Sequence, residues 1–176
     1  MSATITLRPV LESDLPMMAV LRGDPVEASA FGWFGHRDSS SLYRSFSENG
    51  FLTPEGGTLV VLGGGAPVGL VSWHQVRTAP SSFTWNIGIA LQSTGRGQGY
   101  GTAAQRALVE YLFAYTMANR VEACTETENL AEQRALEKVG FQREGVRRGC
   151  AFRDGQWRDM VVYGLVRGDA LKDANA

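Results

Sequence analysis

Stretches of alternating or β-branched residues, separated by glycine and proline turns, predict a series of short strands. The predicted strands cover residues 4–8, 58–62, 68–76, 82–91, 121–125, 141–146 and the two halves of 151–166. Three glycines at 63–65 join the second strand to the third, and Asp154 with Gly155 joins the last two. Both turns therefore predict hairpins.

Apolar residues recur at helical spacing in several intervals between these strands. Helices are predicted from the capping residues 12–14 to about residue 21, and over residues 39–46, 102–118 and 130–139. In the longest helix, Ala104, Leu108 and Leu112 fall on one face. Residues 23–51 mix aromatic residues with glycine and serine and give the weakest pattern. Strands that lead into helices, together with hairpins, predict a mixed α/β fold.

The composition is that of an ordinary globular protein. The chain has 176 residues, 44% of them hydrophobic and 20% charged, with a formal net charge of −1, so no global field favours nucleic acid or an anionic membrane as a partner. The chain has no apolar run long enough to span a bilayer and no signal-peptide pattern, which predicts a single cytoplasmic domain over residues 1–176. Its two cysteines and two histidines have no metal-ligand spacing, so no metal site is expected.

The most informative segment is the glycine-rich turn between the strand at 82–91 and the helix at 102–118. Such a turn directs successive backbone N–H groups into a concavity at the positive end of a helix dipole, where phosphate oxygens bind. Gly97, Gly99 and Gly101 keep Cβ atoms out of that concavity, and Arg96 adds a charged donor. The turn lacks the lysine of a Walker A loop and the glycine spacing of a dinucleotide fold. A turn that only connects strand to helix is the alternative.

Two motifs carry a family resemblance. Residues 96–101 resemble the Q/R-x-x-G-x-G/A motif of the GNAT acetyltransferase superfamily, and Asn129 followed by residues 137–141 resembles its second motif, an asparagine before a helix that ends in E-K-x-G-F. Segments 7–9, 13–15, 120–123 and 155–159 are similar to the RimJ/RimL branch, whose members acetylate protein N-termini and small amines. By this resemblance the chain is identified as an acetyl-CoA-dependent N-acetyltransferase.

The resemblance implies a mixed, mostly antiparallel sheet of six to seven strands, splayed in the middle and flanked by about four helices. It also implies that the pantetheine arm of acetyl-CoA lies along residues 89–91, its pyrophosphate on the glycine loop, and its thiol end near Asn129, which is equally suited to be a helix N-cap. The implied cofactor-binding residues are Ile89, Ala90, Leu91, Arg96, Gly97, Gln98, Gly99, Tyr100, Gly101, Thr102 and Asn129. Many relatives form homodimers, which implies a homodimer here.

Acetyl transfer is the attack of a neutral amine on a thioester, and it depends mainly on holding the two reactants together. The backbone N–H of Leu91 is the predicted donor to the developing oxyanion. The glutamate and tyrosine that serve many relatives as base and acid are replaced here by Cys124 and Leu136. Glu126 lies two residues after Cys124 in the predicted strand, so its side chain points to the same face. It is the predicted replacement base, and His74 is an alternative. Transfer without a protein base also stays open, because an α-amine is partly neutral at physiological pH.

The resemblance places the amine acceptor, a small molecule or a protein N-terminus, between the first helices and the last hairpin. The residues predicted to bind it are Trp33, Phe34, His74 and Trp157. Acidic residues such as Asp38 and Asp159 are available to neutralise a cationic acceptor, although most of the aromatic residues are equally well explained as core. Two other functions stay open: an acyltransferase that uses a different acyl-CoA, and a catalytically silent acyl-CoA-binding protein.

Overall fold

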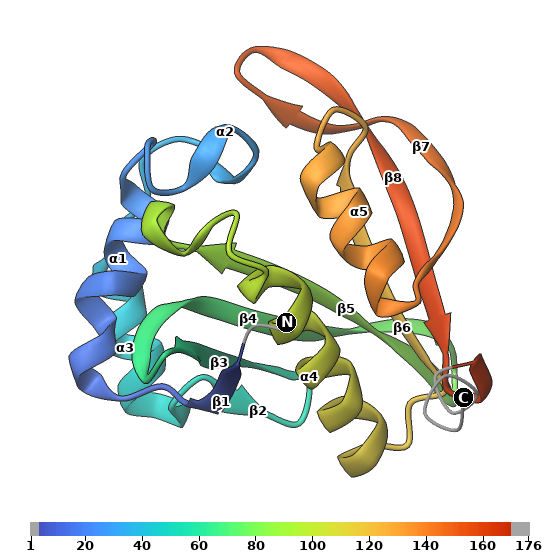
Figure 1. The fold of residues 1–176 in the computed structure, drawn as a ribbon, viewed down its shortest axis with the longest axis horizontal. Coiled ribbons are helices and arrows are strands. Elements are labelled where there is room, and N and C mark those ends of the chain that lie inside the picture. Colours follow the sequence, from blue (N-terminus) through green and yellow to red (C-terminus); the bar gives the residue numbers. More distant parts are fainter. Residues whose placement is uncertain (1–3, 170–176) are drawn as a thin grey trace.

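The computed structural model describes residues 4–169, and one twisted sheet organises them (Figure 1). The strands are β1 Ile5–Pro9, β2 Leu52–Thr53, β3 Gly56–Gly63, β4 Ala66–Ala79, β5 Ser82–Leu91, β6 Arg120–Glu126, β7 Gln142–Arg153 and β8 Gln156–Val166. Their order across the sheet is β1-β3-β4-β5-β6-β8-β7, and β2 pairs with β3 beside this path. The pairing of β5 with β6 is parallel and the other pairings are antiparallel.

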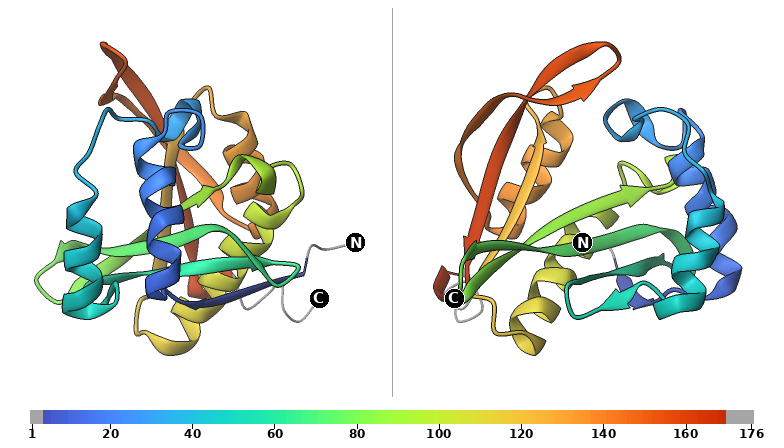
Figure 2. Two further views of the ribbon diagram at one scale, coloured as in Figure 1. Left: turned by 90° about the vertical axis from the view of Figure 1, so that its left-hand side faces the viewer. Right: turned by 180° about the vertical axis from the view of Figure 1, so that it is seen from behind.

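Helices cover both faces of the sheet (Figure 2). They are α1 Leu15–Gly23, α2 Ser29–Gly32, α3 Ser40–Asn49, α4 Tyr100–Tyr115 and α5 Leu130–Val139. Val60 and Val61 are adjacent in β3, yet Val61 packs in a core with Leu108 of α4, and Val60 packs in a second core with Leu42 of α3. Because adjacent strand residues point to opposite faces, α4 and α5 cover one face of the sheet, and α1 and α3 cover the other.

The element order agrees with the sequence prediction, and the differences are local. Among residues 4–169 the sheet has eight strands, because the two-residue β2 is too short to give a pattern, and the one-turn α2 adds a helix within residues 23–51. β7 continues from Gln142 to Arg153, where the sequence predicts a break after residue 146; shifts in its register with β8 bend the strand instead. The predicted last turn is present, with φ angles of 50° at Asp154 and 73° at Gly155.

β5 and β6 separate partway along their length. Parallel pairing joins only residues 85–87 to residues 121–123, whereas β5 stays paired to β4 as far as Leu91. The edge of β5 beyond Ile87 is therefore free on the side of β6. From this point β6, β7, β8 and α5 diverge from the rest of the molecule (Figure 1), so the sheet is splayed where the family resemblance implies. Among residues 4–169, no helix is both long enough and apolar enough to cross a membrane.

Candidate functional site

The free edge of β5 presents backbone groups to the splay. Bonded and non-bonded residue pairs alternate along an antiparallel ladder, and the 2.9 Å bond from the Gln92 N–H to the Val68 carbonyl fixes the phase of that alternation between β4 and β5. The N–H and C=O groups of Ile89 and Leu91 therefore point away from β4 toward the opening, whereas those of Ala90 bond to β4. Of the three residues predicted to pair with a pantetheine arm, two have backbone groups that face the opening.

The glycine loop carries a run of free backbone donors. Gly97 and Gly99 have φ angles of 74° and 81°, in the left-handed region that favours glycine, and Gly99 is the N-cap of α4. Within the part of the chain that the structure describes, no protein group accepts a hydrogen bond from the N–H groups of residues 97–102. The first N–H after them that is bonded is that of Ala103, which donates to the Gly99 carbonyl at 3.1 Å. Successive donors thus converge at the positive end of a 16-residue helix, which is an arrangement that binds phosphate oxygens.

Hydrogen bonds from the Arg96 side chain stabilise this loop. Its Nε donates to the Leu91 carbonyl at 3.1 Å, and one Nη donates to the Glu27 carbonyl. The Glu27 carboxylate accepts hydrogen bonds from the Ser93 N–H at 2.8 Å and the Ser93 hydroxyl at 2.6 Å, which lower the pKa of Glu27. These donors tie the loop to the segment between α1 and α2, while Arg96 also lines the cavity described below; its contact with a phosphate stays a prediction.

Gln98 and Tyr100 also use their side chains within the protein. Gln98 donates its amide to the Thr94 carbonyl. The Tyr100 ring lies over Gly63, so closely that a Cβ there would be 2.7 Å from the ring Cζ. These side-chain contacts stabilise the turn, and the backbone N–H groups of both residues stay available to a ligand.

A cavity of about 620 Å³ runs from this loop through the splay to the segment around α2. All the residues predicted to bind the cofactor line it, except Gln98 and Tyr100. Ile89 and Leu91 form part of one wall, and Cys124 of β6 lies on the other. The free strand edge and the donors of the loop thus belong to one continuous space.

Asn129 is the N-cap of α5 and also lines the cavity. Its Oδ1 accepts a hydrogen bond from the Glu132 N–H at 3.3 Å, and its Nδ2 donates to Thr125 Oγ1 at 2.9 Å. The capping role that the sequence allowed is therefore present. Its contact with a cofactor stays a prediction.

Glu126 lies on the cavity wall with Cys124, as their positions on the same face of β6 predict. Both oxygens of its carboxylate, however, are bonded to Arg153. Its two oxygens accept hydrogen bonds from Nε and Nη2 of Arg153, each at 2.7 Å, and both side chains are buried. These bonds lower the pKa of Glu126, which makes it a weak proton acceptor. Burial raises the pKa of the Cys124 thiol, and Leu136 is fully buried in the core. This geometry gives no support to Glu126 as the general base.

Glu132 is a cavity residue that the sequence did not reveal. It lies in the first turn of α5, where burial raises its pKa to about 7, and it accepts a long hydrogen bond of 3.4 Å from Gln105 of α4. A glutamate early in a helix is ordinary in sequence. Its partial burial follows from the packing of α4 against α5, which no local pattern shows.

The four residues predicted to bind the acceptor are dispersed. Phe34 lines the cavity, but Trp33, His74 and Trp157 do not. Trp33 packs edge-on against His36, and His74 is an exposed residue of β4. Trp157 is 68% exposed near the tip of the last hairpin. Strand register and hairpin direction carry His74 and Trp157 away from the cavity, so of the four predicted residues only Phe34 lines it.

The chain belongs to the acetyltransferase (GNAT) domain family, whose model matches residues 4–142. It is 33% identical to the probable N-acetyltransferase YjcK of Bacillus subtilis (strain 168) over 102 residues, which are 58% of this chain and 56% of that protein. It is 30% identical to the putative ribosomal N-acetyltransferase YdaF of the same organism over 103 residues, 58% of this chain and 55% of that protein. The chain thus matches little more than half the length of these relatives.

Solved structures show the same fold at low sequence identity. The spermidine N-acetyltransferase of Vibrio cholerae, in complex with CoA and spermine, has a TM-score of 0.82 at 18% identity, over 95% of this chain and 98% of that one. Mycobacterium smegmatis RimJ, in complex with CoA-disulfide, has a TM-score of 0.78 at 22% identity, over 98% of this chain and 90% of that one. These likenesses confirm the predicted GNAT fold, and both the RimJ structure and the ribosomal relative agree with the predicted RimJ/RimL resemblance.

Proposed function

We propose that this chain, as a single domain, transfers the acetyl group of acetyl-CoA to a primary amine. The observation that carries the proposal is the run of free N–H groups at residues 97–102 beside the free edge of β5. A pyrophosphate fits donors of this kind, and an extended pantetheine arm can pair with Ile89 and Leu91 as an added strand. Acetyl-CoA supplies the activated acetyl group, while the protein supplies position and hydrogen-bond donors.

The chemistry we propose uses backbone donors rather than a protein base. The Leu91 N–H faces the opening and is the proposed donor to the oxyanion. Glu126 is ion-paired and the pKa of the Cys124 thiol is raised, so neither is suited to accept a proton at neutral pH. An α-amine with a pKa near 8 is partly neutral at that pH. Its nitrogen bonds to the acetyl carbon as the C–S bond of the thioester breaks; the amine loses a proton to solvent, and CoA leaves as a thiolate that takes up a proton from solvent.

A matched pair of glycine variants tests the loop. Gly97 and Gly65 both have positive φ angles, 74° and 87°, and a Cβ on either meets no atom within 4 Å, but only Gly97 lines the cavity. Gly97→Leu and Gly65→Leu therefore carry similar backbone strain, on the order of 1–2 kcal/mol. We expect Gly97→Leu to abolish acetyl-CoA binding in calorimetry and Gly65→Leu to retain it. Equal binding by both variants would contradict the proposal.

A thiol-release assay with acetyl-CoA and a panel of amines and peptides tests the reaction itself. Release that depends on an amine supports transfer. Acetyl-CoA binding without turnover of any amine would instead favour a silent acyl-CoA-binding protein. Faster release from a longer acyl-CoA would favour a different acyl donor.

We also propose a homodimer formed through the last hairpin. Phe152 and Trp157 lie 5.4 Å apart, ring centre to ring centre, and are 56% and 68% exposed. An exposed aromatic pair of this kind is typical of an interface. Light scattering after size-exclusion chromatography should show a dimer that Trp157→Ser weakens, and a monomeric wild type would contradict the proposal. A cytoplasmic location stays a prediction from the sequence.

A further inference from the structure

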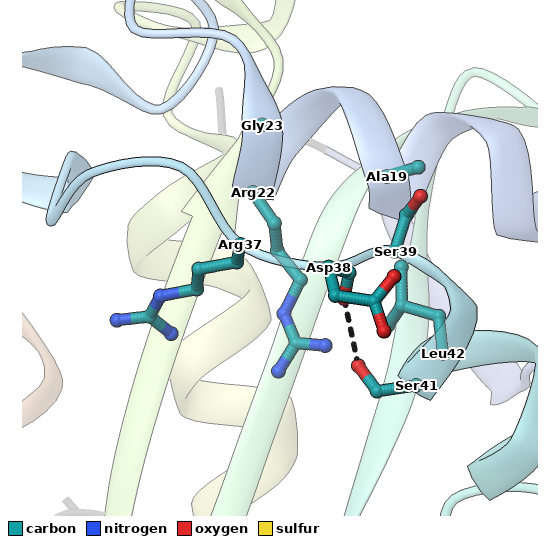
Figure 3. A pocket seen from close by; sticks show the side chains of 8 residues that line it. All are labelled: Ala19, Arg22, Gly23, Arg37, Asp38, Ser39, Ser41 and Leu42. Atoms are coloured by element: carbon teal, nitrogen blue, oxygen red, sulfur yellow. Dashed lines mark hydrogen bonds between the residues drawn. The ribbon is translucent and has the colours of Figure 1, made fainter.

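Two arginines without an acidic partner line the end of the cavity near α1 and α3. Arg22, in the last turn of α1, and Arg37, just before α3, also line a second hollow of about 330 Å³ between these helices. Figure 3 shows the two arginine side chains next to each other, Arg37 extending to the lower left and Arg22 downward, with Asp38 on the other side of Arg22. Burial and repulsion by Arg37 lower the pKa of Arg22, as expected for like charges held close together.

Neither guanidinium is neutralised. Among residues 4–169, no carboxylate forms an ion pair with Arg22 or Arg37. Arg37 makes a cation–π contact instead: its Cζ lies over the Phe34 ring, 5.8 Å from the ring centre. Both guanidinium groups therefore keep their donors available to a ligand.

Four acidic residues line the two spaces. Glu132, in the first turn of α5, has been described above, and the other three are bonded to protein groups. Asp38 accepts hydrogen bonds from the backbone N–H and the hydroxyl of Ser40. Glu27 is bonded to Ser93 at the glycine loop, and Glu126 is ion-paired. Asp38 keeps its negative charge, so the two arginines and Asp38 leave the hollow they share with a net positive charge, which is the opposite of the site for a cationic acceptor that the acidic residues of the sequence suggested.

We propose that the acceptor amine carries an anionic group, a carboxylate or a phosphate, that Arg22 and Arg37 bind. The inference rests on the proposed acetyl transfer and specifies its acceptor. Guanidinium groups match such anions with paired, charge-assisted hydrogen bonds. Ile89 and Leu91 line the same cavity as both arginines, so an acceptor anchored at the arginines extends toward the free edge of β5. The same two positive charges repel a polyamine, so spermine, the ligand of the Vibrio cholerae structure, is a poor acceptor here.

The experiment compares acceptors that differ in one charge. Amino acids and short peptides are assayed against their carboxamides, together with spermidine, in the thiol-release assay, with wild type, Arg22→Gln and Arg37→Gln. Arg77→Gln is the matched control, since Arg77 donates to the Pro80 carbonyl at the other end of β4 and pairs with Phe83, four residues or roughly 14 Å along β5 from Ile87 of the cavity wall. Thermal unfolding checks that each variant is folded.

We expect wild type to prefer an anionic acceptor to its carboxamide by at least about 10-fold in kcat/KM. Arg22→Gln and Arg37→Gln should each raise the KM for that acceptor by roughly 10- to 100-fold, as expected for loss of a charge-assisted bond, and leave acetyl-CoA affinity unchanged. High salt should reduce the preference. Arg77→Gln should behave as wild type.

Three results would overturn the inference. Spermidine could be the best acceptor, or the arginine variants could keep the preference for the anionic group. The variants could also weaken acetyl-CoA binding while leaving acceptor KM unchanged, in which case the arginines bind a phosphate of the cofactor. Each of these leaves acetyl transfer intact. Absence of turnover with every amine, by contrast, would defeat the proposed function and this inference together.

Discussion

Substituting Glu132 tests the electrostatics of the cavity directly. Burial raises the pKa of this carboxyl from 4.5 to about 7, opposed by a single long bond of 3.4 Å from Gln105. Glu132→Gln removes the charge and keeps the shape of the side chain. Its new amide can also donate to Gln105 Oε1, a buried oxygen with no hydrogen-bond partner within residues 4–169. We expect the variant to be more stable than wild type at neutral pH.

The pKa change sets the size and the sign of the effect. A pKa difference between 4.5 and about 7 corresponds to about 3.4 kcal/mol at 1.36 kcal/mol per pH unit. Glu132 keeps some contact with solvent in the cavity, so we expect about 1–3 kcal/mol. The folded state binds the proton more tightly, so wild-type stability falls relative to the variant as pH rises from 4.5 to 7. Below pH 4.5 both states are protonated and the penalty disappears; above pH 7 it is complete.

Urea unfolding of wild type and Glu132→Gln between pH 4.5 and 8.5 measures this difference. Glu110→Gln is the control, because Glu110 is an exposed residue of the neighbouring α4 and its substitution should change stability only slightly. A free-energy difference for Glu132→Gln that is flat across this range would refute the reasoning. A carboxyl pKa near 4.5 for Glu132, measured by NMR, would refute it as well.

Other predictions concern ion pairs and thiols. Asp14→Asn removes the ion pair with Arg8 at 2.6 Å and should lower the free energy of unfolding in urea by about 2 kcal/mol at pH 7. Because the ion pair lowers the pKa of Asp14 below 3.8, the stability difference between wild type and variant should shrink below about pH 4. Glu126→Gln should lower stability by about 2 kcal/mol and leave the shape of the activity–pH profile unchanged, whereas a lost acid limb would restore Glu126 as the base. Cys150 is exposed, and the pKa of Cys124 is raised. A chromogenic disulfide reagent should therefore label Cys150 at least about 10-fold faster, and acetyl-CoA should slow only Cys124; equal rates would contradict this.

The cofactor end of the site could be predicted from the sequence because its donors are backbone groups. The order of strand, turn and helix determines where N–H groups converge, and Gly97 and Gly99 adopt the left-handed conformation that the turn requires. The splay after Ile87 could be anticipated only through the family resemblance, since residues 82–91 read as one uninterrupted strand.

The acceptor end could not be predicted, because it depends on which side chains distant segments bring together. Aromatic character suggested Trp157, and the capacity of an imidazole to relay a proton suggested His74, but strand face and hairpin direction decide whether a side chain reaches the cavity. Strand parity correctly placed Glu126 beside Cys124. It could not show that Arg153, 27 residues further along the chain, is folded back onto that carboxylate.

The charges of the cavity offer a physical reason why this chain can lack the usual base. An amine attacks only in its neutral form, and a nearby positive charge lowers the pKa of an ammonium group. Arg22 and Arg37 bind the anionic part of the proposed acceptor and at the same time favour loss of the proton from its amine. Neutralising either arginine should then move the acid limb of the kcat profile, which reports the bound amine, to higher pH by roughly half a unit to one unit, in addition to raising KM. An acid limb that stays in place would mean that the arginines only anchor the acceptor and that a proton acceptor lies elsewhere in the cavity.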